Sequence, residues 1–433
     1  MSKVPRTLAP GVRAVEVWSW AMLDFANSGY TTVVLTAVFS AYFVGVVAGG
    51  AAWATLAWTA ALSASYLLVM MTLPRLAALA DAHAAKRRLL FLSVLGCVSG
   101  TLILSRVGAG NVWLAVLGIV FSNYCFSLGE SAIASFLPEL AQREALGRVS
   151  GWGWGLGYVG GLISLAIALM IVTRGSNLGF DAIHTVPWVM VATACLFLLA
   201  TVPAWFLLKE RAVATGQSAR STLGAIKHAW IETGGRFTEF RRLLLCIVSY
   251  QAGISVVITL AAVYAEQVMG FDMPRTILLI VAVNVTAGLG ALLFGSFQDR
   301  VGHRLALRVT LLGWILTAFL AFLAVQEWLF WVAACLAGLC MGTSQSAGRA
   351  MVGLMAPSSR LAAFYGLWTF STQLAAATGP LVYGMITWVN NGNQRFAMLC
   401  TGVFFVFALF VLGRLSLDKA IAERDASAST GHV

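Results

Sequence analysis

Three ionisable side chains, Asp24, Glu130 and Arg349, lie inside long apolar stretches of this chain. Charged residues at such positions in a membrane are energetically unfavourable, so they face a polar interior and pair with one another or with a bound solute. A carboxylate of this kind can bind and release a proton, because removal from water disfavours its charged form. An arginine can hold a carboxylate through two parallel hydrogen bonds. The three residues therefore predict proton binding and recognition of a charged solute, and no covalent catalysis.

The composition indicates that these residues belong to a membrane protein. Of the 433 residues, 60% are hydrophobic and only 10% are charged, whereas a soluble domain has about 25% charged residues. This excludes a soluble enzyme, a nucleic-acid-binding protein, a disordered protein and a disulfide-rich scaffold. The net charge of +11 comes from Lys and Arg in loops, so we assign it to membrane topology and expect no nucleic-acid partner. The seven cysteines lack paired spacing, and we expect neither a metal site nor a cofactor.

Apolar runs long enough to span a bilayer, which takes about 20 residues, occur twelve times in the sequence. The expected spans are 16–46, 52–80, 89–107, 112–137, 148–173, 186–208, 243–268, 275–297, 305–325, 328–353, 362–389 and 396–415. We therefore predict an all-α membrane protein of twelve helices in two pseudo-symmetric halves. Its parts are an N-terminal six-helix bundle (1–208), a cytoplasmic linker (209–242), and a C-terminal six-helix bundle with a short cytoplasmic tail (243–433).

Lys and Arg are distributed unevenly between the loops on the two sides of the predicted membrane. The loops on the side opposite the N-terminus contain only Arg106, Arg174, Arg275 and Arg395. Apart from Arg349, which lies within a span, the other basic residues fall on the side of the N-terminus or in the linker. Because basic loops remain in the cytoplasm, both termini are expected to be cytoplasmic.

The loops after the second and eighth predicted spans repeat one pattern, an Asp followed by a basic cluster. Asp81 and Asp299 are 218 positions apart, and Pro138 and Pro357, which end the fourth and tenth spans, are 219 apart. Two landmarks with nearly the same offset predict two homologous halves, which are typical of secondary transporters. A solvated basic turn is the simpler alternative for either loop alone. We predict that both loops form a cytoplasmic gate, made of Asp81, Arg87, Arg88, Asp299, Arg300 and Arg304.

The repeated loop resembles the signature of the major facilitator superfamily, Gly-x-x-x-Asp-Arg-x-Gly-Arg. The second copy supplies Gly295, Asp299, Arg300, Gly302 and Arg304. In the first copy Ala77 stands in place of the leading Gly, and no Gly follows Asp81. The resemblance implies the major facilitator fold and transport by alternating access.

Other segments resemble one group within that superfamily, the fungal vacuolar amino-acid effluxers linked to autophagy and their bacterial relatives. The segments are 20–30 (WAMLDFANSGY), 136–140 (FLPEL), 147–158 (GRVSGWGWGLGY), 342–345 (GTSQ) and 378–381 (TGPL). This resemblance implies a monomeric transporter in a bacterial inner (plasma) membrane, whose partners are lipid, protons and a small solute. From the charged residues Asp24, Glu130 and Arg349 we expect that solute to be an amino acid or another carboxylate or zwitterion.

Polar side chains continue at helical spacing from the charged residues along the first, fourth, seventh and tenth spans, which line the central cavity in that superfamily. The predicted solute-binding residues are Asp24, Asn27, Glu130, Gln251, Gln345, Arg349, Trp368 and Gln373. Polar contacts that merely hold helices together are the alternative. Glu130 and Arg349 each lie eight residues before a proline that ends a span. They and Asp24 are therefore expected at one depth, about 12–13 Å from the cytoplasmic end.

The three charged residues suggest a mechanism of exchange. Arg349 is predicted to bind the carboxylate of the solute, and Glu130, 219 positions earlier, to be its partner in the empty carrier. The solute would displace Glu130, which then accepts a proton, while Asp24 and Asn27 would bind an ammonium group. The alternative is that Glu130 and Arg349 form a permanent structural lock between the halves.

These patterns predict a secondary active transporter that is not an enzyme. It would move a small polar solute by alternating access, with proton coupling through Asp24 or Glu130. One alternative is an exporter of a larger amphipathic metabolite or drug. Another is a membrane receptor or assembly factor that has the same fold but does not transport. The run Gly155-x-Gly157-x-x-Gly160 matches a dinucleotide-binding motif, but it lies within a span and therefore predicts close helix packing.

Overall fold

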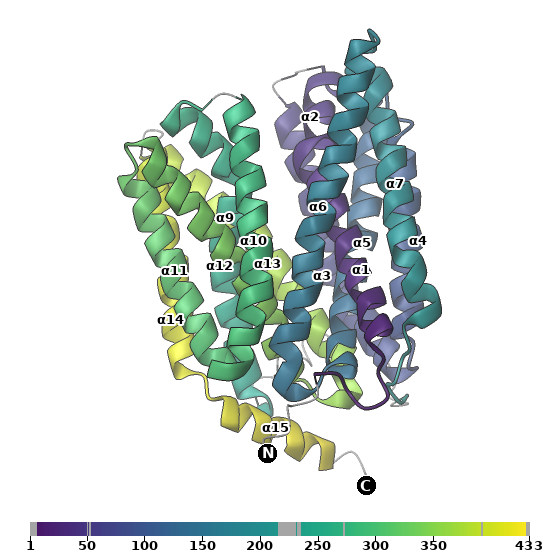
Figure 1. Cartoon of the computed structure of the whole chain (residues 1–433), viewed down its shortest axis with the longest axis vertical. Coiled ribbons are helices and arrows are strands. Elements are labelled where there is room, and N and C mark those ends of the chain that lie inside the picture. The colour runs from purple at the N-terminus through teal and green to yellow at the C-terminus, as the bar shows by residue number, and fades with distance from the viewer. Residues whose placement is uncertain are drawn as a thin grey trace.

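The computed structural model shows long helices that run side by side through the whole height of the molecule (Figure 1). It describes residues 7–49, 51, 53–214, 231, 235–271, 273–390 and 393–429. The described residues contain helices and no β-strand, which confirms the predicted all-α fold class. Much of the predicted linker, residues 215–230 and 232–234, lies outside the described residues.

Six long helices precede residue 208, and the first continues through two short π-helical segments. Their bounds are α1 Ala14–Tyr30 with η1 Thr31–Ala37, α2 Phe39–Tyr42 and η2 Phe43–Val47, then α3 Ala54–Ala82, α4 Lys86–Leu104, α5 Val112–Leu140, α6 Leu146–Asn177 and α7 Ala182–Leu207. A short 3-10 turn, η3 Arg143–Ala145, leads into α6.

Six more long helices and a short terminal helix follow in the described residues from 235 onward. Their bounds are α9 Thr238–Met269, α10 Met273–Val301, α11 His303–Leu323, α12 Glu327–Met355, α13 Leu361–Val389, α14 Gln394–Arg414 and α15 Leu417–Ser429, with the 3-10 turn η4 Ser358–Arg360 before α13.

Eleven helices in the described part of the chain are long and apolar enough to cross a membrane. The predicted span 362–389 corresponds to α13, which is 29 residues long but is not among the eleven. Its centre contains the polar run Thr369-Phe-Ser-Thr-Gln373. Because α13 packs between α9, α3 and α5, it is the twelfth long helix of the bundle, and its polar residues face other helices.

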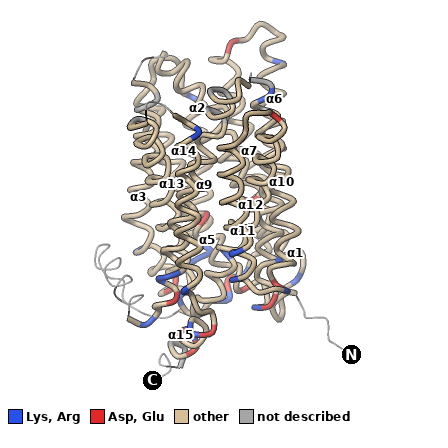
Figure 2. Tube along the Cα trace, turned by 90° about the vertical axis from the view of Figure 1, so that its left-hand side faces the viewer, with Lys and Arg blue, Asp and Glu red and all other residues tan. Residues whose placement is uncertain are grey.

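The described N-terminal segment and the C-terminal helix α15 lie at the same end of the bundle, the lower end in Figure 1; we call this the basal end. Lys and Arg gather there, as the blue segments in Figure 2 show. α15 lies across the basal end and packs on α9 and α12. Its Arg424 is buried and donates a 2.6 Å hydrogen bond to the carbonyl of Leu354 at the end of α12.

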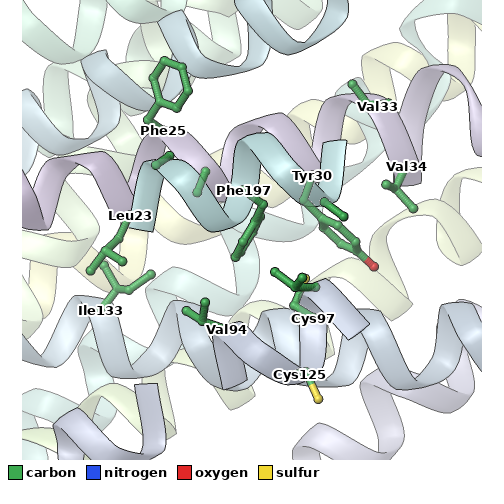
Figure 3. Packing of buried hydrophobic residues seen from close by; sticks show 14 of the residues in the cluster. Leu23, Phe25, Tyr30, Val33, Val34, Val94, Cys97, Cys125, Ile133 and Phe197 are labelled. Carbon is green, nitrogen blue, oxygen red and sulfur yellow. The ribbon is translucent and has the colours of Figure 1, made fainter. Parts of the chain in front are cut away.

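Tight side-chain packing holds α1, α4, α5 and α7 together. Figure 3 shows the cluster, which includes Leu23, Val94 and Ile133. Tyr30 stacks on Phe126 with ring centroids 5.0 Å apart and meets the edge of Phe197 at 6.4 Å. Such aromatic pairs contribute about 0.5–1.5 kcal/mol each beyond area burial, which matters here because lipid provides no hydrophobic force between helices.

Glycines bring α6 into backbone contact with helices on both of its sides. A Cβ on Gly151 would lie 2.3 Å from the carbonyl oxygen of Ala291 in α10, and one on Gly160 would lie 2.3 Å from the carbonyl oxygen of Phe25 in α1. Small residues that allow this approach are typical of membrane helix interfaces. The glycine run of α6 is therefore a packing motif, as the sequence predicted, and it places α1, α6, α10 and α12 close together.

Candidate functional site

A buried ion pair joins α1 to α12 in the middle of the bundle. Nη1 of Arg349 donates hydrogen bonds to both carboxylate oxygens of Asp24, at 3.0 and 2.7 Å. Asp24 is 8% and Arg349 is 2% exposed. Charge-assisted hydrogen bonds of this kind are the strongest that proteins form. The pair links residues 325 positions apart in the chain and connects the first six helices to the last six.

The other two guanidinium nitrogens of Arg349 donate hydrogen bonds to α6. Its Nε donates to the hydroxyl of Ser150 at 3.1 Å, and its Nη2 donates to the Ser150 carbonyl at 2.9 Å. Its guanidinium lies 4.8 Å from the ring centroid of Trp20 and 5.4 Å from that of Trp154. Each guanidinium nitrogen thus has an acceptor in the protein, and two aromatic rings cover the group. Arg349 therefore has a counter-charge and an acceptor for each of its nitrogens without a solute.

The predicted Glu130–Arg349 pair is not formed. Asp24 is the carboxylate that pairs with Arg349 instead. The repeat relates Glu130 and Arg349 by depth, but depth does not determine which side chains meet. α12 packs closely on α6 and only weakly on α5. Gly153 of α6 lets α1 and α12 meet, since a Cβ there would lie 2.2 Å from Asp24 Oδ2 and 2.5 Å from Arg349 Nη2.

Glu130 is half-buried on α5, and no hydrogen bond or ion pair joins its carboxylate to another described residue. Asp24 and Arg349 are close enough to act on it electrostatically. The three charged side chains therefore lie near one another, but only two of them are paired. Asp24 and Arg349 neutralise each other, while the Glu130 carboxylate has no counter-charge of its own.

The amide side chains of the predicted site form two separate contacts. Nε2 of Gln251 donates to Oε1 of Gln345 at 2.9 Å and so links α9 to α12. Nε2 of Gln373 donates to the Ser127 hydroxyl at 3.1 Å and links α13 to α5, one turn from Glu130. The predicted residue Asn27 is buried on α1, one turn from Asp24.

Several buried polar atoms near these contacts have no hydrogen-bond partner. They include the indole N–H of Trp368, predicted as a solute contact, and the hydroxyl of Thr369 beside it on α13. Buried polar atoms are normally paired, so each exception calls for an explanation. Within the described residues, no three His, Cys, Asp or Glu side chains are grouped closely enough to hold a metal ion.

The residues that hold Arg349 were only partly predictable. Ser150, Gly153 and Trp154 all lie in the segment 147–158, which the sequence singled out as a resemblance and a glycine-rich packing motif. Nothing in the spacing showed that its hydroxyl and carbonyl face an arginine about 200 residues further on.

At the basal end, the two predicted gate aspartates each bind the first turn of a helix from the other half. Asp81 at the end of α3 accepts hydrogen bonds from the backbone N–H groups of Ala362 and Ala363 in α13, at 3.1 and 2.8 Å. Asp299 in α10 accepts from those of Gly147 and Arg148 in α6, both at 2.9 Å. A carboxylate at a helix N-terminus binds unpaired N–H groups and the positive end of the helix dipole.

The predicted gate arginines do not take part in these contacts between halves. Arg87 donates to the carbonyl of Trp205, and Arg304 donates to that of Leu412 at 3.1 Å, so both bind within their own half. Arg88 and Arg300 are exposed. Helix N-termini thus replace the arginines as partners of the aspartates, because the close approach of α3 to α13 and of α10 to α6 buries backbone N–H groups there.

The close approach at Gly153 predicts that Gly153→Ala separates Asp24 from Arg349 and destabilises the protein. Overpacking of this kind costs roughly 1–3 kcal/mol, which should lower the unfolding temperature measured in detergent. Gly384→Ala is the matched control, because nothing lies within 4 Å of a Cβ at that helical position. Equal unfolding temperatures for the two variants would contradict the geometry at Gly153.

Comparison with known proteins agrees with this architecture. Residues 42–425 match the model of the family described as "vacuole effluxer Atg22 like". The chain is similar to the uncharacterized MFS-type transporter YxiO of Bacillus subtilis, with 24% identity over 91% of this chain and 92% of that protein. It is 27% identical to autophagy-related protein 22-1 of Aspergillus fumigatus over 69% of this chain and 53% of that protein. The chain thus spans about half the length of that fungal relative.

Solved structures with low sequence identity share the fold. The human organic anion transporter MFSD10 superposes with a TM-score of 0.72 at 14% identity, covering 93% of this chain and 100% of that chain. A bacterial homologue of the iron transporter ferroportin in an outward-facing state gives 0.70 at 13% identity, covering 93% and 99%. The proton:xylose symporter XylE gives 0.70 at 16% identity, covering 92% and 94%. The chain therefore belongs to the Atg22-like vacuole effluxer family and is a multi-pass membrane transporter of the major facilitator type.

Proposed function

We propose that this protein is a secondary active transporter that moves a small polar solute, an amino acid or a similar zwitterion, through a bacterial inner membrane. Transport proceeds by alternating access and is coupled to protons. The observation that carries this proposal is the buried Asp24–Arg349 pair between helices of the two halves. Both charges are neutralised only while the two halves hold Asp24 and Arg349 in contact. A proton or a solute that binds one of the two charges can therefore shift the halves to another arrangement.

The units that move are residues 1–208 and 243–433. The contacts of Asp81 with α13 and of Asp299 with α6 support a closed basal end in this conformation. The basal end corresponds to the cytoplasm, because Lys and Arg gather there (Figure 2). The conformation described is accordingly the one that faces away from the cytoplasm.

Proton coupling follows from the cost of leaving Arg349 without its counter-charge. Protonation of Asp24 removes that counter-charge, and an unpaired buried charge is strongly destabilising. The halves then favour an arrangement in which Arg349 finds another partner. Glu130, within electrostatic range on α5, is the second carboxylate that can take up the proton or become the new partner.

We expect Asp299→Asn to shift the population toward a basal end that is open. The change removes a negative charge from the first turn of α6, which is worth about 1–2 kcal/mol in a partly buried setting and so shifts the equilibrium about 5- to 30-fold. The reporter is the thiol introduced by Ser346→Cys. Ser346 is 1% exposed and lies against Gly147 at the interface that must open.

Labelling of that thiol by a membrane-impermeant maleimide, followed by peptide mass spectrometry, measures the open fraction. Asp418→Asn is the matched control, because Asp418 is an exposed carboxylate at the same end. Labelling should rise in Asp299→Asn and remain unchanged in Asp418→Asn. Equal labelling in all three backgrounds would rule out a gating role for Asp299.

Transport itself should respond to a pH gradient. In proteoliposomes, uptake of a radiolabelled mixture of the twenty amino acids should rise severalfold when a pH gradient is imposed, and a protonophore should abolish the increase. Asp24→Asn should remove the response to the gradient, since its side chain no longer binds a proton. If labelled amino acids enter at a rate that neither the gradient nor the protonophore changes, proton coupling is wrong. If none enters, the solute class is wrong.

A further inference from the structure

We infer that the solute carries a positively charged amine, that this amine binds the Glu130 carboxylate, and that amine and proton exchange with each other at that residue. The inference rests on the proposed function and specifies the charge that its binding site recognises. It reverses the expectation that an anionic group binds Arg349.

The first step concerns the hydrogen bonds that Arg349 already makes. Its Nε, Nη1 and Nη2 already donate to Ser150 and Asp24, and it is 2% exposed between two tryptophan rings. A carboxylate solute would have to break the contact between the halves before it could bind. Arg349 is therefore a structural cation in this conformation, because each of its three nitrogens already donates to the protein.

The second step is the charge around Glu130. The charged groups that act on it from neighbouring helices are Asp24 on α1 and Arg349 on α12, and Tyr66 faces it from α3. Asp24 and Arg349 cancel each other, so ionised Glu130 leaves this level of the bundle with one negative charge. That charge attracts a cation and repels a carboxylate, and the low dielectric of the interior strengthens both effects.

The third step is the set of polar groups beside Glu130. The Gln373–Ser127 contact fixes α13 against α5 one turn away from Glu130. α5 and α13 are antiparallel, because α5 ends and α13 begins at the basal end. Thr369 precedes Gln373 by one turn, so it lies on the same face of α13, toward α5 and level with Glu130. It is 1% exposed, and its hydroxyl has no partner.

An ammonium group matches this set of groups. It has three N–H donors and no acceptor, and it can donate to the Glu130 carboxylate and to the oxygen of the unpartnered Thr369 hydroxyl.

The exchange balances in charge and in protons. When the ammonium binds, Glu130 releases its proton to the side from which the solute came; when the solute leaves, Glu130 takes up one proton. No covalent bond other than the carboxyl O–H forms or breaks. Glu130 is neutralised by one proton when the site is empty and by one ammonium group when the solute is bound. Because proton and amine cannot both occupy Glu130, each turnover moves them in opposite directions.

The test uses purified full-length protein and two matched series of probes, the n-alkylamines from propylamine to hexylamine and the corresponding n-alkyl carboxylates. Binding is followed by the shift in unfolding temperature, and proton release by a pH indicator in weakly buffered detergent solution. At least one amine should raise the unfolding temperature and release protons, and no carboxylate should do either. Binding of carboxylates alone, or of neither series, would overturn the inference.

Variants at Glu130 assign the effect to that residue. Glu130→Gln should weaken amine binding about 10- to 100-fold, as expected for loss of a hydrogen bond to a charged group, and should abolish proton release. Glu130→Asp keeps the charge on a shorter side chain, so it should bind the amine more weakly and still release protons. This variant decides the question if Glu130→Gln does not fold. Glu144→Gln, at an exposed carboxylate, should behave like the unmodified protein.

The outcomes separate this inference from the proposed function. Proton release that persists in folded Glu130→Gln would contradict exchange at Glu130, even if the protein transports amino acids in response to a pH gradient. Absence of any gradient-driven flux in the unmodified protein would contradict the proposed function, whatever the probes bind. Amine binding that depends on Glu130 would still support the charge preference of the site.

Discussion

Arg349 is a buried cation, so it needs a counter-charge and hydrogen-bond acceptors wherever it lies in the membrane. None of these acceptors comes from its own helix, α12. The carboxylate comes from α1, and the hydroxyl and carbonyl of Ser150 come from α6. Satisfying this one side chain therefore brings three helices from both halves together at one depth. Any rearrangement of the halves must move Arg349 together with its partners or provide new ones, and for that reason the pair is suited to couple ion binding to conformational change.

Other residues at the interface between the halves allow the Asp24–Arg349 ion pair to form. Glycines of α6 allow α1 and α10 to approach at backbone distance, and Gly153 leaves space for the ion pair itself. At the basal end, Asp81 and Asp299 bind the first turns of α13 and α6 in a pseudo-symmetric arrangement. Their energies are those of a charge at a helix terminus, a few kcal/mol together. Contacts of this size hold one state and still allow exchange with another.

The sequence predicted the features that depend on position along a helix. Hydropathy located the long helices, although α13 is too polar at its centre to count as a membrane span by composition. Spacing from the helix ends placed Asp24 and Arg349 at one depth, and the repeat indicated that Asp81 and Asp299 act alike. Features that depend on rotation about a helix and on the crossing of two helices were not predictable. For this reason Arg349 was assigned to Glu130, and arginines were expected where helix N-termini bind the aspartates.

A double-mutant cycle on Asp24 and Arg349 tests most directly whether this ion pair holds the halves together. The quantity measured is the free energy of unfolding in detergent for the unmodified protein, Asp24→Asn, Arg349→Gln and the double variant. Each single change leaves a buried charge without its partner and should cost about 3–5 kcal/mol. The double variant should cost much less than the sum, because it leaves no unpaired charge. Costs that add to within about 0.5 kcal/mol would show that the two residues act independently and would contradict the central role of the pair.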